Sequence, residues 1–381
     1  MKTIDIIAKL CGNAHRGMGS KELGKAQDWL VSHIKSYSGV QIERQEVKTA
    51  KTYIPFMLMV MWPLAFFMFG RYVNMPFAIL SLYLCLELWL FFDWRGPQLQ
   101  RCFGNTKGHN IIAKKGSGSN MLILMAHVDS APSSFAYRPS QVKHYAFNVM
   151  IGLFLVSLAS AIQLYGSLVG FDLISPVVTS AIALLLILLS LVTMIDYLFK
   201  GFVPGANDNG SGVATALKSA EQLWHDMPDD SEVWLVLTTA EEAGMLGAYA
   251  FWQKYGPKLK EKQAKVINID TVGQGALKVV TKTGAITKLS YDNILTTAAR
   301  SLIADCSAFS TIEEHHHLVG DFDSVWMARD GLDVITLAAY DENGLMPYIH
   351  TKFDIMGHLD EAVMQQTIDF AQALLRKVAK D

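Results

Sequence analysis

Four long apolar segments, grouped in two closely spaced pairs, constrain this chain more than any other feature of its sequence. Residues 54–70 and 76–92 form the first pair, and residues 146–169 and 173–199 form the second. A helix needs about 20 apolar residues to cross the ~30 Å hydrocarbon core of a bilayer, and each segment approaches or exceeds that length. The sequence therefore predicts two transmembrane helical hairpins and a multi-pass integral membrane protein with four spans.

The amino-acid composition agrees with a chain that is partly embedded in lipid. Of the 381 residues, 51% are hydrophobic and only 18% are charged, against about 25% charged residues in ordinary soluble domains. The alternative is a pair of hairpins buried in a large soluble core or lying in the membrane interface. Segments that are apolar on every side, such as AIALLLILLSLV, argue against an interfacial position.

The distribution of basic residues predicts the orientation in the membrane. An even number of crossings leaves all the remaining sequence on one side. The hairpin tips hold only Arg71, whereas the other membrane ends carry a group of basic residues: Lys48, Lys51, Arg95, Arg101, Arg138, Lys143 and Lys200. The positive-inside rule then places the bulk of the chain in the cytoplasm. We expect the carboxylate of Asp196 to reach the membrane–water interface. For Glu87 two interpretations stay open, an interfacial position and a functional role within the membrane.

Net charge and cysteine spacing exclude several classes of protein. The formal net charge is −2 and long basic runs are absent, so no nucleic-acid partner is expected. The four cysteines are widely spaced and form no C-x-x-C motif, which argues against a disulfide framework and a zinc-thiolate site. The N-terminal segment lacks the uninterrupted apolar core of a signal peptide and is typical of a short amphipathic helix.

Outside the hairpins, the sequence predicts one α/β domain composed of residues 1–52, 94–145 and 200–381, with the hairpins at 53–93 and 146–199. Runs rich in β-formers alternate with helical patterns, which favours a largely parallel sheet. The expected strands cover residues 40–47, 121–126, 232–238, 266–270, 277–281 and 334–338. The expected helices cover residues 20–37, 211–225, 290–305 and 359–378.

Histidines and carboxylates follow the expected strands at the points where the strands end, and two loops carry further ones. These candidate site residues are His127, Asp129, Asp208, Glu241, Glu242, Asp270 and His350. Functional residues of open parallel sheets gather beyond the carboxyl ends of the strands, so we expect these side chains to lie together. Imidazole nitrogens and carboxylate oxygens without thiolates are a donor set for zinc or a similar divalent ion.

The number of ligands suffices for two metal ions. Two ions about 3.5 to 4 Å apart need a shared ligand, and Asp208 can provide it. His127 and Asp270 would complete one site, and Glu242 and His350 would complete the other.

Two carboxylates remain for other tasks. Glu241 is the expected general base, because adjacent residues leaving a strand point in different directions and Glu242 already faces the metal. Asp129 can accept the second ring N–H of His127 and so select its tautomer.

Each of these motifs has an ordinary structural explanation when taken alone. A Glu-Glu pair commonly begins a solvated helix, and GANDNGSG is compatible with a turn and a helix cap. Their joint occurrence, in order and at strand and loop ends, favours a site. The triplet His315, His316 and His317 resembles a metal-binding tract, but its place between two glutamates and a Gly-Asp turn favours an exposed loop.

The motifs together resemble the M28 family of co-catalytic zinc aminopeptidases. The matching segments occur in the family's order: AHVDSAP, PGANDNGSG, TTAEEAGMLGAYAF, INIDTVGQG, GDFDSVWMARDG and IHTKFD. The resemblance implies a three-layer zinc-exopeptidase-like fold with a central mixed, mostly parallel sheet, into which the two predicted transmembrane hairpins would be inserted. It also implies two Zn²⁺ ions per chain, other divalent metals being an alternative, with the same ligands as above, Glu241 as general base and Asp129 behind His127.

The sequence departs from the M28 pattern in two places. A membrane hairpin separates His127 from Asp208, two residues that lie within a few tens of residues of each other in soluble relatives. Many family members also carry a tyrosine, shortly before the Ser-Asp turn, that would assist the oxyanion, whereas this chain reads HHHLVGDFD. His317, Tyr340 and Tyr348 are the candidates to replace it.

These inferences predict a membrane-anchored hydrolase, a dinuclear zinc aminopeptidase that removes N-terminal residues from peptides. A membrane amidase acting on lipid-like or N-acylated substrates is the alternative, and a catalytically inactive scaffold is a third hypothesis. The expected partners are a peptide substrate, the lipid bilayer and a second copy of the chain bound through the hairpins. Residue specificity, the native metal and the physiological substrate stay open at this level.

Overall fold

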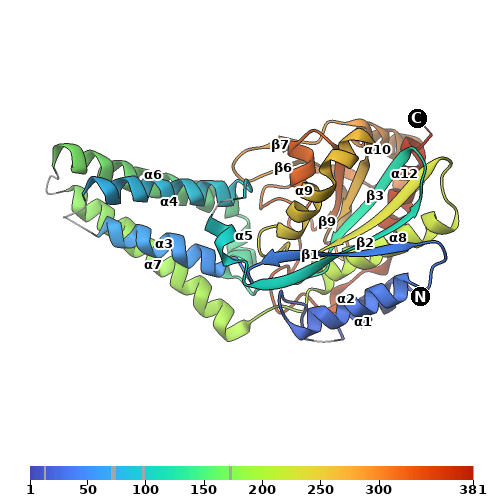
Figure 1. Ribbon diagram of the computed structural model, residues 1–381, viewed down its shortest axis with the longest axis horizontal. Coiled ribbons are helices and arrows are strands. Elements are labelled where there is room, and N and C mark those ends of the chain that lie inside the picture. The colour runs from blue at the N-terminus through green and yellow to red at the C-terminus, as the bar shows by residue number, and fades with distance from the viewer. Residues whose placement is uncertain (13, 70–73, 97–98, 171–173, 381) are drawn as a thin grey trace.

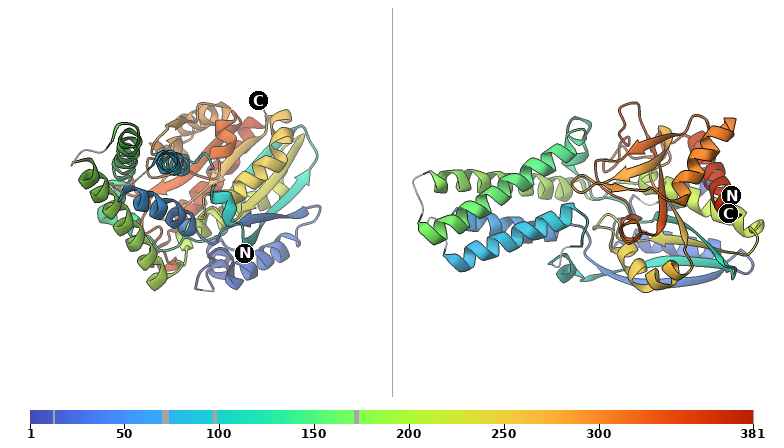
Figure 2. Two further views of the ribbon diagram at one scale, coloured as in Figure 1. Left: turned by 60° about the vertical axis from the view of Figure 1, so that its left-hand side comes forward. Right: turned by 90° about the horizontal axis from the view of Figure 1, so that it is seen from above.

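The molecule has an α/β domain at one end and a bundle of apolar helices at the other. The computed structural model describes residues 1–12, 14–69, 74–96, 99–170 and 174–380. Figure 1 shows the bundle projecting from one side of the sheet, while both termini lie on the α/β domain, away from the bundle. The two further views in Figure 2 show the same separation of the two parts.

A nine-stranded mixed sheet forms the centre of the α/β domain, in the order β1-β2-β4-β3-β5-β9-β6-β7, with β8 beside β6. The four central strands β4, β3, β5 and β9 run parallel, and antiparallel pairs lie on both sides of them. The sheet is mixed as expected, with its parallel part confined to these strands and the β6–β8 pair. The strands are β1 Gln41–Thr49, β2 Thr106–Gly116, β3 Asn120–His127, β4 Ser231–Thr238, β5 Lys265–Ile269, β6 Ala276–Thr283, β7 Leu289–Ser290, β8 Glu313–His316 and β9 Asp333–Tyr340.

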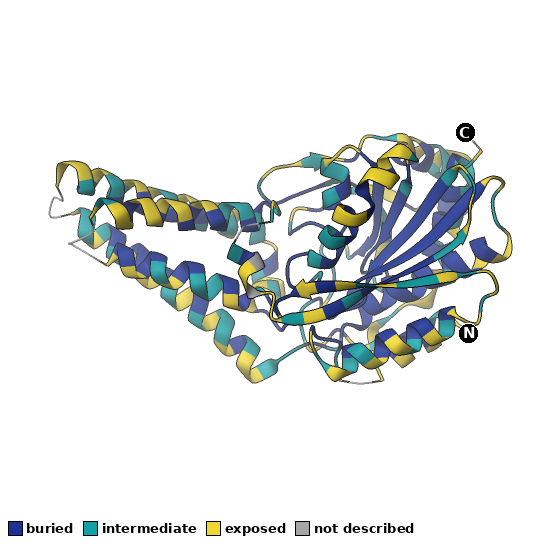
Figure 3. Ribbon diagram, in the orientation of Figure 1, coloured by how far each residue is buried: buried dark blue, intermediate teal, exposed yellow. Residues whose placement is uncertain are grey.

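Helices cover both faces of the sheet and make the three layers that the motifs predict. Successive side chains of a strand point to opposite faces, so Leu122 and Leu124 enter one core while Ile123 and Met125 enter the other. Figure 3 shows the central strands buried along nearly their whole length. The helices of the domain are α1 Thr3–Leu10, α2 Lys21–Ile34, α8 Gly212–His225, α9 Leu246–Glu261, α10 Ile294–Asp305, α11 Val325–Arg329 and α12 Glu361–Val378.

The four apolar segments form the helices of the bundle, which has a core of its own. These helices are α3 Ile54–Met68, α4 Met75–Phe92, α6 Tyr145–Val169 and α7 Ser175–Lys200. Three of them, α4, α6 and α7, are long and apolar enough to cross a membrane, and α3 is a shorter apolar helix of 15 residues. The predicted hairpin tip at Arg71 lies outside the described residues. The count of four spans therefore stays a prediction.

Polar side chains of the bundle form hydrogen bonds between its helices and further contacts at the end of the bundle that adjoins the α/β domain. The indole of Trp89 on α4 donates to Ser157 on α6 at 2.9 Å. Asp196 pairs with Lys200 at 2.5 Å, next to the α/β domain. Glu87 is buried and accepts from the backbone N–H of Leu99 at 3.0 Å, so it holds the chain that leaves α4.

The sequence patterns missed β2, β7, β8, α9 and α11. Strand β2 pairs on both sides but is polar at both ends, which hides its short buried segment. Helix α9 contains Pro257 and two glycines, which weaken its helical signal. Strand β8 consists of Glu313–His316 at the edge of the sheet, and only its pairing with β6 makes it extended. All of these elements depend on contacts with distant segments.

Candidate metal centre

The order of the parallel strands brings the predicted residues together. Strand β3 lies between β4 and β5, so His127 at the end of β3 lies between the loops that follow its two neighbours. Those loops carry Glu241 with Glu242 after β4, and Asp270 after β5. Two further elements reach the same edge of the sheet: η3 (Ala206–Ser211), which carries Asp208 and precedes α8, and the loop after β9, which carries His350.

Asp208 stands between the two histidines. Its Oδ1 lies 3.2 Å from Nε2 of His127, and its Oδ2 lies 3.2 Å from Nε2 of His350. Asp270 Oδ2 lies 3.6 Å from the same nitrogen of His127, and Glu242 Oε2 lies 3.3 Å from that of His350. The residues thus form two triads that share Asp208, and the ligand atoms within each triad lie within 4.8 Å of one another.

Glu241 and Asp129 lie beside the triads. Glu241 Oε2 is 4.0 Å from Nε2 of His127, and Glu241 also lines the cavity in front of the cluster. The carboxylate of Asp129 accepts from the backbone N–H groups of Glu241 and Glu242 at 3.3 and 3.2 Å. The ring Nδ1 of His127 is 3.1 Å from the backbone carbonyl of Asp129 and 3.7 Å from its carboxylate. The backbone carbonyl of Asp129, not its carboxylate as expected, is therefore the nearer acceptor for this ring nitrogen.

The cluster has more negative charge than its own side chains can neutralise. Burial raises the pKa of Glu241 and of Glu242 well above the usual value, and neighbouring carboxylates raise both further. Burial also raises the pKa of Asp270 to about 6. Asp208 has a lowered pKa, because hydrogen bonds from both histidines outweigh its burial. Buried carboxylates in such number are stable when they are paired or coordinate a cation.

Several supporting residues were given no role in the sequence analysis. Asp354, at the end of the IHTKFD motif, accepts from the backbone N–H groups of Asn207 and Asp208 at 2.6 and 3.0 Å, and so holds the loop that presents the shared carboxylate. The ring of Tyr137 stacks on His350 with 3.8 Å between centroids. A stacking partner more than 200 positions away in the chain can be recognised only in the folded structure.

Arg16 is the most buried of these supports. Its side chain is fully buried, and its Nε donates to the carbonyl of Val128 at 2.8 Å. Its two terminal nitrogens donate to the carbonyls of Pro204 at 3.0 Å and Gly205 at 2.7 Å. Arg16 therefore connects the loop after His127 to the loop before Asp208, although the apolar helices α6 and α7 separate these loops in sequence.

The structure separates the three candidates for an oxyanion partner. His317 is buried, contrary to the expected exposed loop, because it packs against Phe322 and Tyr340. It lines the same cavity as the cluster, and the Tyr340 hydroxyl is 3.1 Å from its Nδ1. Burial lowers the pKa of His317 to about 3, so the ring is neutral. Tyr348 is 41% exposed and is not among the lining residues.

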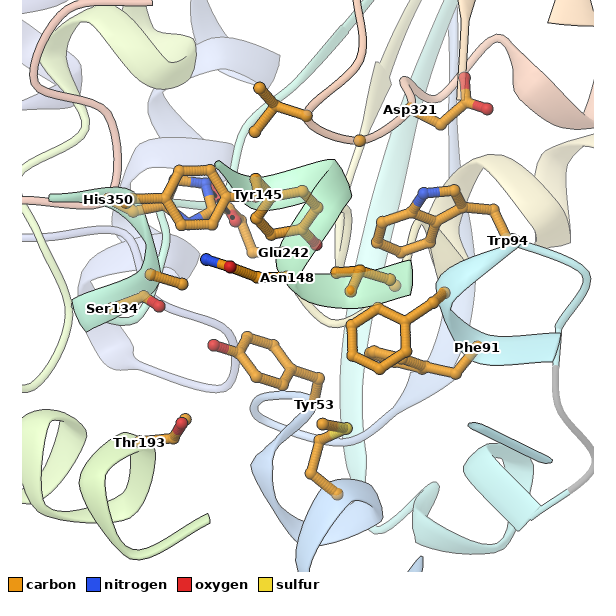
Figure 4. A pocket seen from close by; sticks show the side chains of 18 of the residues that line it. Tyr53, Phe91, Trp94, Ser134, Tyr145, Asn148, Thr193, Glu242, Asp321 and His350 are labelled. Atoms are coloured by element: carbon orange, nitrogen blue, oxygen red, sulfur yellow. Dashed lines mark ion pairs between the residues drawn. The ribbon is translucent and has the colours of Figure 1, made fainter. Parts of the chain in front are cut away.

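A cavity of about 360 Å³ begins at the cluster and continues into the bundle. The cluster lines one end of it, and residues of α3, α4, α6 and α7 line the other. Figure 4 shows His350 and Glu242 near Tyr145 and Asn148 of α6, with Tyr53, Phe91 and Trp94 around the same space. The cavity therefore extends from the cluster in the α/β domain to the helices of the bundle.

The chain is similar to known peptidases in sequence and in fold. Residues 193–375 match the sequence profile of Peptidase family M28. Aminopeptidase YwaD of Bacillus subtilis (strain 168) is 27% identical over 181 residues, which cover 47% of this chain and 39% of that protein. The chain thus spans about two fifths of the length of this curated relative.

Two solved structures share the fold over nearly the whole chain. A Zn-dependent exopeptidase from Parabacteroides distasonis has a TM-score of 0.55 and 18% identity, with 99% of this chain and 96% of that chain covered. A glutaminyl cyclase from Bacteroides thetaiotaomicron has a TM-score of 0.57 and 15% identity, with 100% and 97% covered. This fold is therefore found both in an exopeptidase and in a glutaminyl cyclase, two enzymes with different reactions. The resemblance predicted from the motifs is confirmed: residues 193–375 match Peptidase family M28, and the relatives that this chain resembles are aminopeptidases.

Proposed function

We propose that the protein is a membrane-anchored dinuclear zinc aminopeptidase that removes N-terminal residues from peptides. The position of Asp208 carries this proposal, since its two oxygens face two different histidines and belong to two triads. A carboxylate in this position is what a pair of neighbouring ions requires of a shared ligand.

The donor set fits two divalent ions. His127, Asp208 and Asp270 would hold one, and Asp208, Glu242 and His350 would hold the other. The second oxygen of Glu242, Oε1, is buried and has no hydrogen-bond partner, which leaves it available to a cation. When bound, such ions polarise the scissile carbonyl and lower the pKa of a water molecule.

The residues of the chain would then move the proton. Glu241 lines the cavity within 4.0 Å of His127 and lies beside both triads without being needed as a ligand. Its carboxylate would take a proton from the attacking water and deliver it to the departing amine. Asp129 would hold the backbone of Glu241 and Glu242 during this transfer, through its two hydrogen bonds to their N–H groups.

His317 would assist the developing oxyanion. If the Tyr340 hydroxyl donates to Nδ1, the other ring nitrogen keeps its proton and can donate within the cavity. A neutral imidazole is suited to this role, as a hydrogen-bond donor that carries no charge of its own.

Tyr340→Phe tests this arrangement. The change removes the hydroxyl that selects the tautomer of His317 while keeping the ring, so we expect kcat to fall by about tenfold, the equivalent of one hydrogen bond of ~1.4 kcal/mol. KM and the metal content should stay close to those of the wild type, as steady-state kinetics and elemental analysis would show. Tyr348→Phe is the matched control, because Tyr348 is exposed and outside the cavity. Equal kcat values for the two variants would exclude His317 and Tyr340 from this step.

The membrane arrangement is part of the proposal. Helices α3 and α4 would form one transmembrane hairpin, at residues 53–93, and α6 and α7 would form the other, at residues 146–199. The catalytic domain, residues 1–52, 94–145 and 200–381, would face the cytoplasm. The bundle exposes large apolar side chains along its length, which supports a lipid environment and leaves room for a second copy of the chain.

Metal content and substrate preference test the proposed function together. We expect about two zinc ions per chain in the detergent-purified protein, and chelator-sensitive release of amino acid from leucine amide, which has a free amine. If the active protein contains cobalt or manganese in place of zinc, the proposed metal is wrong and the proposed reaction stands. Neither metal nor turnover would instead support the third hypothesis, an inactive scaffold.

A further inference from the structure

The cavity in front of the cluster is longer than an aminopeptidase needs. Its lining residues on α6 run from Tyr145 to Val156, a length of about 16 Å at 1.5 Å per helical residue. No side chain of a terminal amino acid reaches that far. The bundle end of the cavity must therefore accept something more extended than one residue.

Beyond Tyr145 and Asn148 at the end nearer the cluster, the wall formed by the bundle helices is mainly hydrocarbon. Its apolar residues come from all four helices: Met57, Leu58, Met61, Leu88, Leu153, Val156 and Leu186. Among the polar residues here, the Ser190 hydroxyl donates to the carbonyl of Ile187 at 2.8 Å and accepts from the Trp62 indole at 2.9 Å. The Thr193 hydroxyl donates to the carbonyl of Leu189 at 3.0 Å.

This wall distinguishes between two kinds of extended occupant. An extended peptide would bring an N–H and a C=O group into the wall with every residue, and few of them would find a partner there. An alkyl chain brings no polar group at all. The chemistry of the wall therefore favours a long acyl chain over a peptide.

The mouth of the cavity lies on the apolar side of the bundle. Among the described lining residues, the exposed ones come from η2 (Phe135–Tyr137), α6 and α7: Phe135, Ala136, Asn148 and Leu189. Figure 1 shows α6 and α7 close together at the hairpin tip and apart beside the α/β domain. Leu189 is 50% exposed, and Leu188 and Val192 next to it on α7 are exposed as well. In a membrane, an opening surrounded by such residues faces lipid.

Gly152 on α6 is a lining position at which an added side chain has room. It lines the cavity, and a Cβ atom added to it would meet no other atom within 4 Å. A larger side chain at this position would therefore enter the cavity without displacing the fold.

From these observations we propose that the cavity holds the acyl chain of a long-chain N-acyl amide, which enters from the bilayer between α6 and α7 and is hydrolysed at the cluster. The water oxygen bonds to the acyl carbonyl carbon, the C–N bond breaks, and the nitrogen leaves as an amine that takes up a proton. The products are a fatty carboxylate and a free amine. This inference rests on the proposed metal-dependent amide hydrolysis and membrane insertion, and extends them to a substrate whose acyl group replaces the terminal residue.

A chain-length series tests the inference on the full-length, zinc-loaded protein in lipid nanodiscs. The substrates are N-acetylglycine, N-hexanoylglycine and N-dodecanoylglycine, with leucine amide measured in parallel. We expect kcat/KM to rise at least about tenfold from the acetyl to the dodecanoyl substrate, because the longer chain fills the apolar wall. This increase in kcat/KM should be much smaller than the one predicted for moving the same alkyl chain out of water, because the chain enters the cavity from lipid.

Gly152→Phe should remove most of this preference. The new ring would occupy the path of the chain, so the ratio of kcat/KM for dodecanoyl to acetyl substrate should fall at least about fivefold. Ile151→Phe is the matched control, because Ile151 is the next residue, 43% exposed and not among the lining residues. The control should keep the wild-type ratio. If Gly152→Phe and Ile151→Phe have the same ratio of kcat/KM for the dodecanoyl and acetyl substrates, the acyl chain does not lie beside Gly152 and the proposed position is wrong.

Photo-crosslinking gives a second measurement that needs no turnover. N-dodecanoylglycine with a terminal diazirine should label peptides of α6 and α7 in the Glu241→Gln protein, and unlabelled dodecanoylglycine should compete with it better than hexanoylglycine.

The outcomes separate this inference from the proposed function. Cleavage of leucine amide without chain-length dependence and without labelling of α6 and α7 would overturn the acyl-chain inference alone. Stronger competition by free-amine peptides of several apolar residues would identify a peptide occupant and overturn it as well. Absence of turnover in both substrate series would overturn the proposed amide hydrolysis, and this inference with it.

Discussion

Glu241→Gln is expected to lower kcat by about 10³-fold while leaving both metal ions bound. Glutamine has the same shape but cannot accept a proton from water, and removing a general base typically costs 10² to 10⁴ in rate. The five ligand side chains are unchanged in this variant, so elemental analysis should still find the wild-type metal content. Steady-state hydrolysis of leucine amide would measure the loss of rate.

The neighbouring glutamate provides the contrast that makes this test specific. Glu242→Gln changes a proposed ligand, so we expect it to lose metal as well as activity. Glu361→Gln, at the start of α12 and on the surface, should change neither quantity. A Glu241→Gln enzyme with near-normal kcat would contradict the assigned role, and one that lost its metal would make Glu241 a ligand instead.

Arg16→Met should cause a large loss of stability although Arg16 is not a proposed metal ligand. The substitution keeps much of the apolar stem but leaves three buried carbonyls without their donor, at about 1 to 3 kcal/mol each. Part of this cost will be relieved by relaxation, so we expect a loss of about 3 to 5 kcal/mol in the free energy of unfolding. For a domain of this size that corresponds to a fall of roughly 10 °C in Tm, measured by thermal unfolding in detergent.

The same variant should also bind metal more weakly, because Arg16 joins the loop after His127 to the loop that carries Asp208. Zinc affinity from competition with a chelator would measure this effect. Arg44→Met is the control, since Arg44 forms an ion pair with Asp28 at the surface and should change stability by less than about 0.5 kcal/mol. If both arginine variants unfold at the same temperature, Arg16 does not carry the connection between the loops.

The position of the second hairpin gives this connection its importance. The hairpin lies in the chain between His127 and Asp208, so the triad around His127 requires two loops that are far apart in the sequence to meet. Arg16 comes from the N-terminal segment and contacts both loops. The apolar helix bundle and the candidate metal centre can thus share one chain without a short linker between His127 and Asp208.

The candidate ligands were predictable from the sequence because of strand geometry. His127, Glu242 and Asp270 each follow a buried apolar strand, and parallel strands direct their carboxyl ends to one edge. The structure brings these residues together with Asp208 and His350. Local sequence was sufficient here, since the periodicity of a strand and the residue that follows it lie within a few positions of each other.

The sequence alone determined the apolar helices, the α/β class and the residues of the candidate metal centre. Each of these depends on short-range patterns: hydrophobic length, alternation, and the residue type at a strand end. Only the tertiary structure placed Arg16, Asp354 and Tyr137 around the ligands, buried His317 beside Tyr340, and joined the site to a cavity between the helices. These features depend on contacts between segments far apart in the chain, and hydrogen bonds to backbone carbonyls or gaps between helices leave no pattern in the order of the amino acids.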